Sequence, residues 1–154
     1  MASAVASEII GANLLLMAYD HDPGADTAII TSPDGGTTKR VMDLSNGIRA
    51  FGVQVRPTIV AGNGVVKVEI VAAENAAMSA NLTVIKDSGA IVADSLNDVV
   101  FLEALASEIR QLGAALRYVA ARITMATSTD EANVTYIGWE PRFRKTGLTA
   151  TLIT

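Results

Sequence analysis

The sequence predicts a mainly β protein, an antiparallel, jelly-roll-like β-sandwich with one short helix near residues 106–113. Clusters of Gly, Pro, Asn and Asp recur at short intervals and mark turns between apolar runs. The runs between them are short and rich in β-branched residues, as in sandwiches and barrels. Half of the residues are hydrophobic but only 5% are aromatic, a composition typical of packed sheet surfaces.

The composition also limits the classes of function. A chain of 154 residues suits one domain without a stabilising metal, and the absence of cysteine excludes thiol catalysis and Cys-ligated zinc. The net charge of −4 disfavours nucleic-acid binding, since no excess of cations is present to neutralise phosphates. No apolar run is long enough to span a bilayer, and no Lys or Arg precedes Lys39 as in a signal peptide. We therefore expect a soluble protein without a cofactor.

The N-terminal residues 1–26 are predicted to form an arm or an extra element, and residues 27–154 the sandwich. The apolar part of this arm is a candidate contact surface or swapped element, because it fits poorly into a self-contained sandwich. Its candidate interface residues are Ile9, Ile10, Leu14, Leu15 and Met17.

The loop that follows, residues 20–26, carries three aspartates and His21, the only histidine. Carboxylates could hold calcium, but the full pattern of a calcium-binding loop, with alternating acids, a central Gly and a distal Glu, is missing. A solvated loop with Asx-turns is the favoured interpretation. Any catalytic triad would have to use His21, and no nucleophile motif lies near it.

Seven or eight strands are expected between the turns. The clearest is Val65 to Ala72, which alternates with a period of two. Pro57 predicts an edge strand or a break at Arg56, because proline cannot donate to a ladder. The pair Asn63-Gly64 favours a hairpin before Val65. The expected strands span residues 27–31, 39–44, 48–60, 65–73, 81–85, 90–96, 117–126 and 133–139.

Residues 102–123 are ambiguous, because leucines, isoleucines and a valine recur at heptad spacing and permit one long helix. Gly113 lies in its middle, and the residues from Tyr118 onward favour a strand. We favour a short helix capped by Ser107 and ended by Gly113, followed by a strand. Residues 117–139 would then form a hairpin with Val119, Ala121, Ile123 and Met125 on one face, and an acidic tip at Asp130 and Glu131.

The segment "WEPRFRKTG" (139–147) is where basic and aromatic residues concentrate. It could dock an acidic partner, because Trp and Arg are enriched at the centres of interfaces. The alternative is a solvated exit loop. Its candidate interface residues are Trp139, Arg142, Phe143, Arg144 and Lys145.

Three segments resemble those of small virion structural proteins of tailed bacteriophages: "VMDLSNGIRAFGVQV" (41–55), "VVKVEIVAAENAAMSANLTVI" (65–85) and "LRYVAARITMATSTDEANVTYI" (116–137). In the first of them an Asp-Leu-Ser step precedes a strand. The resemblance implies a β-sandwich that builds part of a virion assembled in the host cytoplasm, with no catalytic residues. It also implies contacts with copies of itself and with other virion proteins such as the major capsid protein.

Several hypotheses on function therefore stand side by side. The first is a capsid decoration or cement protein that forms a symmetric oligomer on the shell. The second is a tail or neck component that stacks into rings or tubes. A carbohydrate-binding sandwich is the third, with aromatic side chains that stack on sugar rings. An enzyme is the least favoured, because its active site would have no Cys and at most one His.

Overall fold

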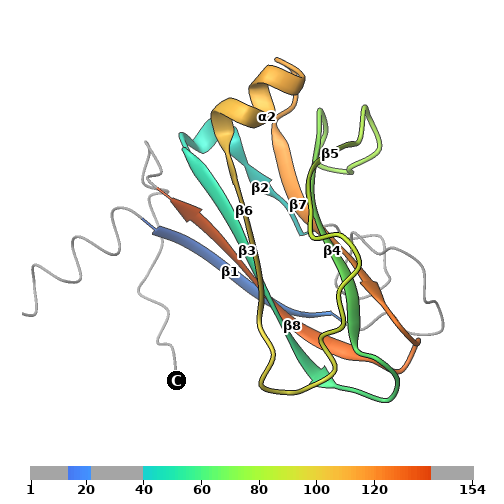
Figure 1. Ribbon diagram of the computed structural model, residues 1–154. Coiled ribbons are helices and arrows are strands. Elements are labelled where there is room, and N and C mark those ends of the chain that lie inside the picture. The colour runs from blue at the N-terminus through green and yellow to red at the C-terminus, as the bar shows by residue number, and fades with distance from the viewer. Residues whose placement is uncertain (1–13, 22–39, 140–154) are drawn as a thin grey trace, which may run out of the picture.

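The computed structural model describes residues 14–21 and 40–139, which form two antiparallel four-stranded sheets packed face to face (Figure 1). Sheet A has the strand order β1 (Leu14–His21), β8 (Glu131–Trp139), β3 (Ala50–Ile59) and β6 (Val100–Leu105). Sheet B has the order β2 (Met42–Asp43), β7 (Tyr118–Met125), β4 (Val65–Ala73) and β5 (Thr83–Asp87).

This strand order is that of a jelly roll, in which the first four strands pair in turn with the last four. A 3-10 turn η1 (Leu44–Asn46) and the helix α2 (Ala106–Leu112) complete the described elements. The predicted mainly β sandwich with one short helix is confirmed.

Alternation along the strands builds the core between the two sheets. On β7, Val119, Ala121, Ile123 and Met125 are all buried, as predicted. They meet residues of sheet A that alternate in the same way. The largest fully buried side chain is Tyr136, on β8.

The predicted hairpin over residues 117–139 is wrong. Strands β7 and β8 are consecutive, but β7 pairs in sheet B and β8 pairs in sheet A. The chain therefore crosses between the sheets at residues 126–130. The hairpin expected at Asn63-Gly64 is wrong for the same reason, because it joins β3 of sheet A to β4 of sheet B.

One buried carboxylate ties these two crossings together. Asp130 is fully buried, and its Oδ1 accepts hydrogen bonds from the N–H groups of Ala61 (2.6 Å) and Gly62 (2.8 Å) in the first crossing. Its Oδ2 accepts one from the N–H of Thr127 (2.9 Å) in the second. The predicted acidic tip is thus, at Asp130, an internal link between two loops.

Pro57 neither ends β3 nor makes it an edge strand along its whole length. Over Ala50–Val55, β3 lies between β6 and β8, but from Arg56 onward only β8 pairs with it. The missing N–H of proline therefore costs no bond to β6, and the register with β8 shifts between Pro57 and Ile59. Proline thus lies where β3 has a neighbour on one side only, although β3 is a central strand over most of its length.

The ambiguous stretch from residue 98 contains a strand, a helix and a second strand. The long-helix alternative is wrong, because β6 precedes α2 and β7 follows it. Gly113 ends the helix as predicted, with its N–H donated to the carbonyl oxygen of Ile109. Ser107 does not cap it, since the N-cap is Leu105, whose N–H donates to Glu108 Oε2 (2.8 Å).

Several predicted strand limits differ from the structure. Residues 14–21, assigned from the sequence to an arm or extra element, form β1, which pairs with β8 along its whole length. Strand β6 was not predicted, because it overlaps the heptad pattern of residues 102–123. Residues 39–44 contribute only the two residues of β2, and residues 90–96 only bridges at Ala93. The strand expected at residues 27–31 lies outside the described residues.

A buried chain of hydroxyl groups links the two sheets just before β2 begins. Beyond Val119, β2 no longer pairs with β7, and the N–H of Ala121 donates instead to the hydroxyl oxygen of Tyr136 (2.7 Å). The Tyr136 hydroxyl also hydrogen-bonds the hydroxyl of Tyr19 (2.8 Å), on β1. Burial raises the pKa of Tyr136 to about 12 and raises that of Tyr19 as well, so both stay protonated at neutral pH.

We expect Tyr136→Phe to lower the free energy of unfolding by about 2 kcal/mol, because it leaves the buried Ala121 N–H without an acceptor. Urea denaturation measures the effect. Tyr118→Phe is the matched control, since Tyr118 is half-buried, and it should change stability by less than about 0.5 kcal/mol. Equal stability of the two variants would contradict a structural role for the Tyr136 hydroxyl.

Candidate functional site

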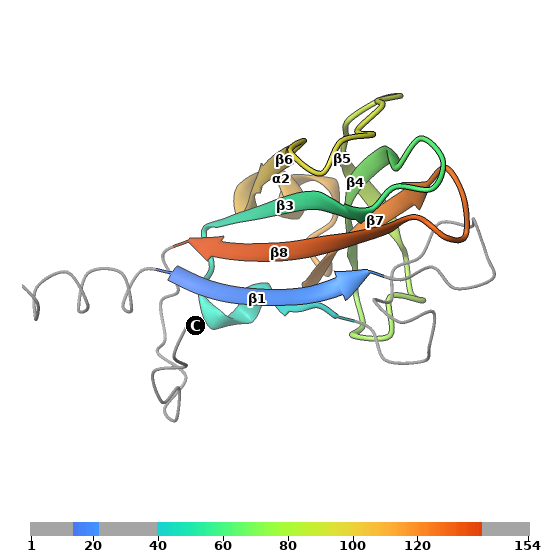
Figure 2. The ribbon, with the colours of Figure 1, turned by 90° about the horizontal axis from the view of Figure 1, so that it is seen from below.

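The outer face of sheet A is the most unusual surface of the described molecule. Antiparallel sheets that face water on one side normally carry polar residues there. Figure 2 shows β1, β8 and β3 of this sheet side by side, and β6 follows β3. The register places three outward rows on this sheet, of which β1 contributes to the last two: Trp139, Ala50, Leu105; then Leu16, Ile137, Gly52, Glu103; then Ala18, Thr135, Gln54, Phe101.

Large apolar side chains are exposed in these rows. Leu16 is 50% exposed, Trp139 49%, Phe101 51% and Leu105 52%. Glu103 is the sole charged residue of the three rows, and it forms no ion pair in the described part of the chain. This exposed apolar face is the candidate interaction surface of the described residues.

A shallow hollow of about 310 Å³ lies within this face. The small residues Ala50 and Gly52 form part of its lining, together with Trp139, Phe101 and Glu103. The Phe101 ring lies against Gly52, because a Cβ added to that glycine would come within 3.1 Å of the ring. The hollow exists where small residues lie beside large ones on adjacent strands.

The structure places some of the predicted interface residues on this face. Trp139 lies on it, at the end of β8. Leu14 and Leu15 belong to β1, whereas Met17 faces inward and packs against the core. The remaining candidates lie outside the described residues: Ile9, Ile10, Arg142, Phe143, Arg144 and Lys145.

Sequence reasoning missed the residues that complete the face. Leu16 follows from counting two residues on from Leu14, and Ile137 from counting two residues back from Trp139. Phe101 and Leu105 were missed because the heptad pattern of residues 102–123 concealed β6. No local signal in the sequence shows that these strands share one sheet.

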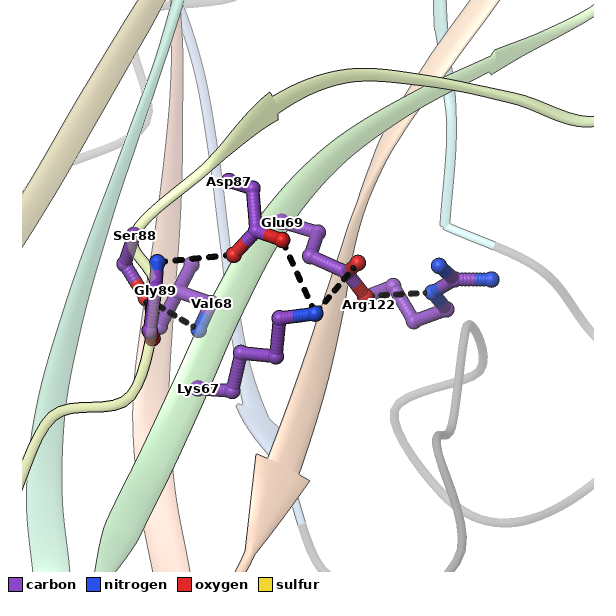
Figure 3. Close-up of polar contacts among 7 residues, drawn as sticks. All are labelled: Lys67, Val68, Glu69, Asp87, Ser88, Gly89 and Arg122. Carbon is purple, nitrogen blue, oxygen red and sulfur yellow. Dashed lines mark hydrogen bonds and ion pairs between the residues drawn. The ribbon is translucent and has the colours of Figure 1, made fainter.

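A network of ion pairs lies on the opposite sheet (Figure 3). Glu69 on β4 is only 3% exposed, and its carboxylate binds Lys67 Nζ (3.0 Å) and Arg122 Nε on β7 (2.7 Å). Lys67 also binds Asp87 Oδ2 at the end of β5 (2.9 Å). Two cations and two carboxylates thus connect three strands.

The charges of this network neutralise one another. The hydrogen bond from Arg122, supported by Lys67, holds the pKa of Glu69 below its usual range despite burial. The pKa of Asp87 is lowered by its hydrogen bond with Lys67. Because each charged group already has a partner, we interpret the network as structural.

The "MDLSN" segment (42–46) contributes Asp43 to a second ion pair. Asp43 caps the turn η1 through Ser45 N–H (2.8 Å) and accepts two bonds from Arg117, at 2.8 and 2.6 Å. The Arg117 hydrogen bond is the main reason that the pKa of Asp43 falls to about 2. The Asp-Leu-Ser step therefore fastens the short β2 to the start of β7.

Three other features considered from the sequence are a metal site, a membrane-spanning segment and His21. In the part of the chain that the structure describes, no three His, Cys, Asp or Glu residues gather closely enough to hold a metal ion. No helix there has the length and apolar character needed to cross a membrane. His21 is buried at the end of β1, opposite Ala132.

The chain matches no protein-family model and no curated protein.

Proposed function

We propose that this protein is a non-enzymatic structural protein of a tailed-phage virion, a capsid decoration or cement protein that forms a symmetric oligomer on the shell. The observation that carries the proposal is the apolar outer face of sheet A, with Leu16, Phe101, Leu105 and Trp139 about half exposed. A face of this kind suits a protein that works by contact with other subunits.

Two further points support the proposal. Jelly rolls recur in viral capsid proteins, although a fold by itself does not determine a function. The segments that resemble small virion proteins coincide with parts of the sandwich that hold it together. They include the Asp43 cap, the Glu69 network and the crossing at Asp130.

Quantitative mass spectrometry of purified virions tests the proposal. We expect the protein in the particles at a copy number close to that of the major shell protein. A few dozen copies or fewer would favour the tail or neck alternative. Absence from particles whose genome encodes the protein would overturn the virion assignment.

A carbohydrate-binding module is the second candidate, and the hollow beside Trp139 favours it. Trp139 and Phe101 offer exposed rings, and Glu103 could accept hydrogen bonds from sugar hydroxyls. Lectin domains also use the jelly roll. A glycan-array signal that disappears in Trp139→Ala but persists in Val84→Ala, on sheet B, would support this candidate.

A further inference from the structure

We infer that a second copy of this chain covers the outer face of sheet A, around a two-fold axis that runs along the strands between β8 and β3. The inference deepens the proposed function and rests on it for its biological context, because it names the partner of the oligomer.

The chemistry of the face restricts what can cover it. All four strands are paired within the sheet, so the face offers no backbone groups to an extended segment laid flat upon it. Such a segment would bury its own N–H and C=O groups without partners. A sheet that has already satisfied its own backbone avoids this cost, and two such faces can pack about 10 Å apart.

The proposed axis pairs large side chains with small ones. A two-fold axis along the strands places β8 of one copy over β3 of the other, and β1 over β6, with equal rows in register. The hollow beside Ala50 then receives Trp139, the bulkiest side chain of β8. The facing positions are Trp139 over Ala50, Ile137 over Gly52 and Phe101 over Ala18, and the Phe101 ring leans toward Gly52 of its own sheet.

A two-fold axis across the strands gives poorer pairs, which decides between the two orientations. It would place polar or charged residues on apolar ones, at a cost in desolvation. Its facing pairs would be Asn133 over Trp139, Arg56 over Ala50 and Glu103 over Phe101. With the axis along the strands, Glu103 meets Leu16 at the outer strands instead, where its carboxylate can still reach water.

The size of the face predicts a weak dimer. Four strands by seven residues cover about 19 Å by 24 Å, or roughly 450 Å² per copy. The total of roughly 900 Å² lies below the range of about 1,200–2,000 Å² that specific, stable interfaces bury. We therefore expect association in the micromolar range rather than a permanent dimer.

Sedimentation equilibrium of the full chain, over a range of micromolar concentrations, tests the inference. We expect a monomer–dimer equilibrium that Leu16→Glu weakens at least about tenfold, because the new carboxylate faces Glu103 of the second copy. Leu16→Lys should retain the dimer, because the ammonium faces the same Glu103. Val84→Glu, a matched control on an exposed position of β5, should leave it unchanged.

Trp139, the only tryptophan of the chain, gives a second readout that needs no variant. Its fluorescence should shift to the red on dilution, as the indole leaves the hollow of the second copy and meets water. Equal weakening by Leu16→Glu and Leu16→Lys would overturn the axis along the strands. A protein that stays monomeric with constant emission would overturn the inference.

These results are distinguishable from those that test the proposed function. A dimeric protein that is absent from virions would overturn the virion assignment and leave the dimer intact. A monomeric protein that is present in virions would overturn the dimer and leave the virion assignment intact.

Discussion

Asp130→Ala should lower the free energy of unfolding by about 3 kcal/mol, because three backbone N–H groups lose their shared acceptor. The carboxylate is fully buried, and it joins the loop at residues 60–64 to the loop at residues 126–130. Both loops carry the chain from one sheet to the other, so their loss of order would loosen the same end of the sandwich. Urea denaturation followed by circular dichroism measures the change.

Two comparison variants make this measurement specific. Asp130→Asn keeps one carbonyl oxygen but turns an amide donor toward a backbone N–H, so an intermediate loss of about 1–2 kcal/mol is expected. Asp94→Ala removes an exposed aspartate and should change stability by less than about 0.5 kcal/mol. A loss in Asp130→Ala no larger than that in Asp94→Ala would show that the carboxylate does not hold the crossings together.

Asp130 also makes the stability depend on pH. Burial alone would raise the pKa of its carboxyl group, but the hydrogen bonds from Gly62, Ala61 and Thr127 outweigh burial and lower it. A lowered pKa in the folded state means that this stabilisation is complete above the unfolded value of about 3.9 and is lost as the pH falls below it. The stability of Asp130→Ala should therefore fall less steeply than that of the natural protein under acidic conditions.

Gly64→Ala should cost at least about 3 kcal/mol, for two reasons that act together. Gly64 has a φ of +62°, which residues with a side chain rarely adopt. An added Cβ would also clash with the carbonyl oxygen of Ala93, which accepts a hydrogen bond from Val65 N–H (3.1 Å). The substitution would therefore disturb the start of β4 and its bridge to Ala93.

Gly89→Ala separates the two causes. Gly89 has a similar φ of +69°, but a Cβ there would meet no atom within 4 Å. It should cost about 1 kcal/mol, from backbone strain alone. A difference of about 2 kcal/mol between the variants, measured by thermal or urea unfolding, would report the clash with Ala93, and equal losses would argue against it.

The helix–strand region near Gly113 shows how far local signals reach. The glycine ends α2 and Tyr118 starts β7, as β-branched and aromatic content predicted. The heptad spacing nevertheless concealed β6, because spacings of three and four can arise where a strand, a helix and another strand follow one another. Leu102 faces the core from a strand and Ile109 from a helix, although both belong to one apparent stripe.

The connections show where local signals fail. Asn63-Gly64 and the acidic segment before β8 have the composition of hairpin turns, yet each joins one sheet to the other. A short polar loop with a positive-φ glycine serves either connection, since composition fixes the turn but not the strand that pairs afterwards. In a jelly roll that partner lies far along the chain, as β1 and β8 show.

The sequence by itself determined a β-rich composition, the strand at β4, the alternating burial along the second half of β7, and one short helix with its glycine stop. Those features depend on residues a few positions apart. Only the tertiary structure decided which strands pair, that Asp130 joins two crossings, and that Leu16, Phe101 and Trp139 share one apolar face. Backbone pairing between distant strands brings these residues together, and no local pattern specifies it.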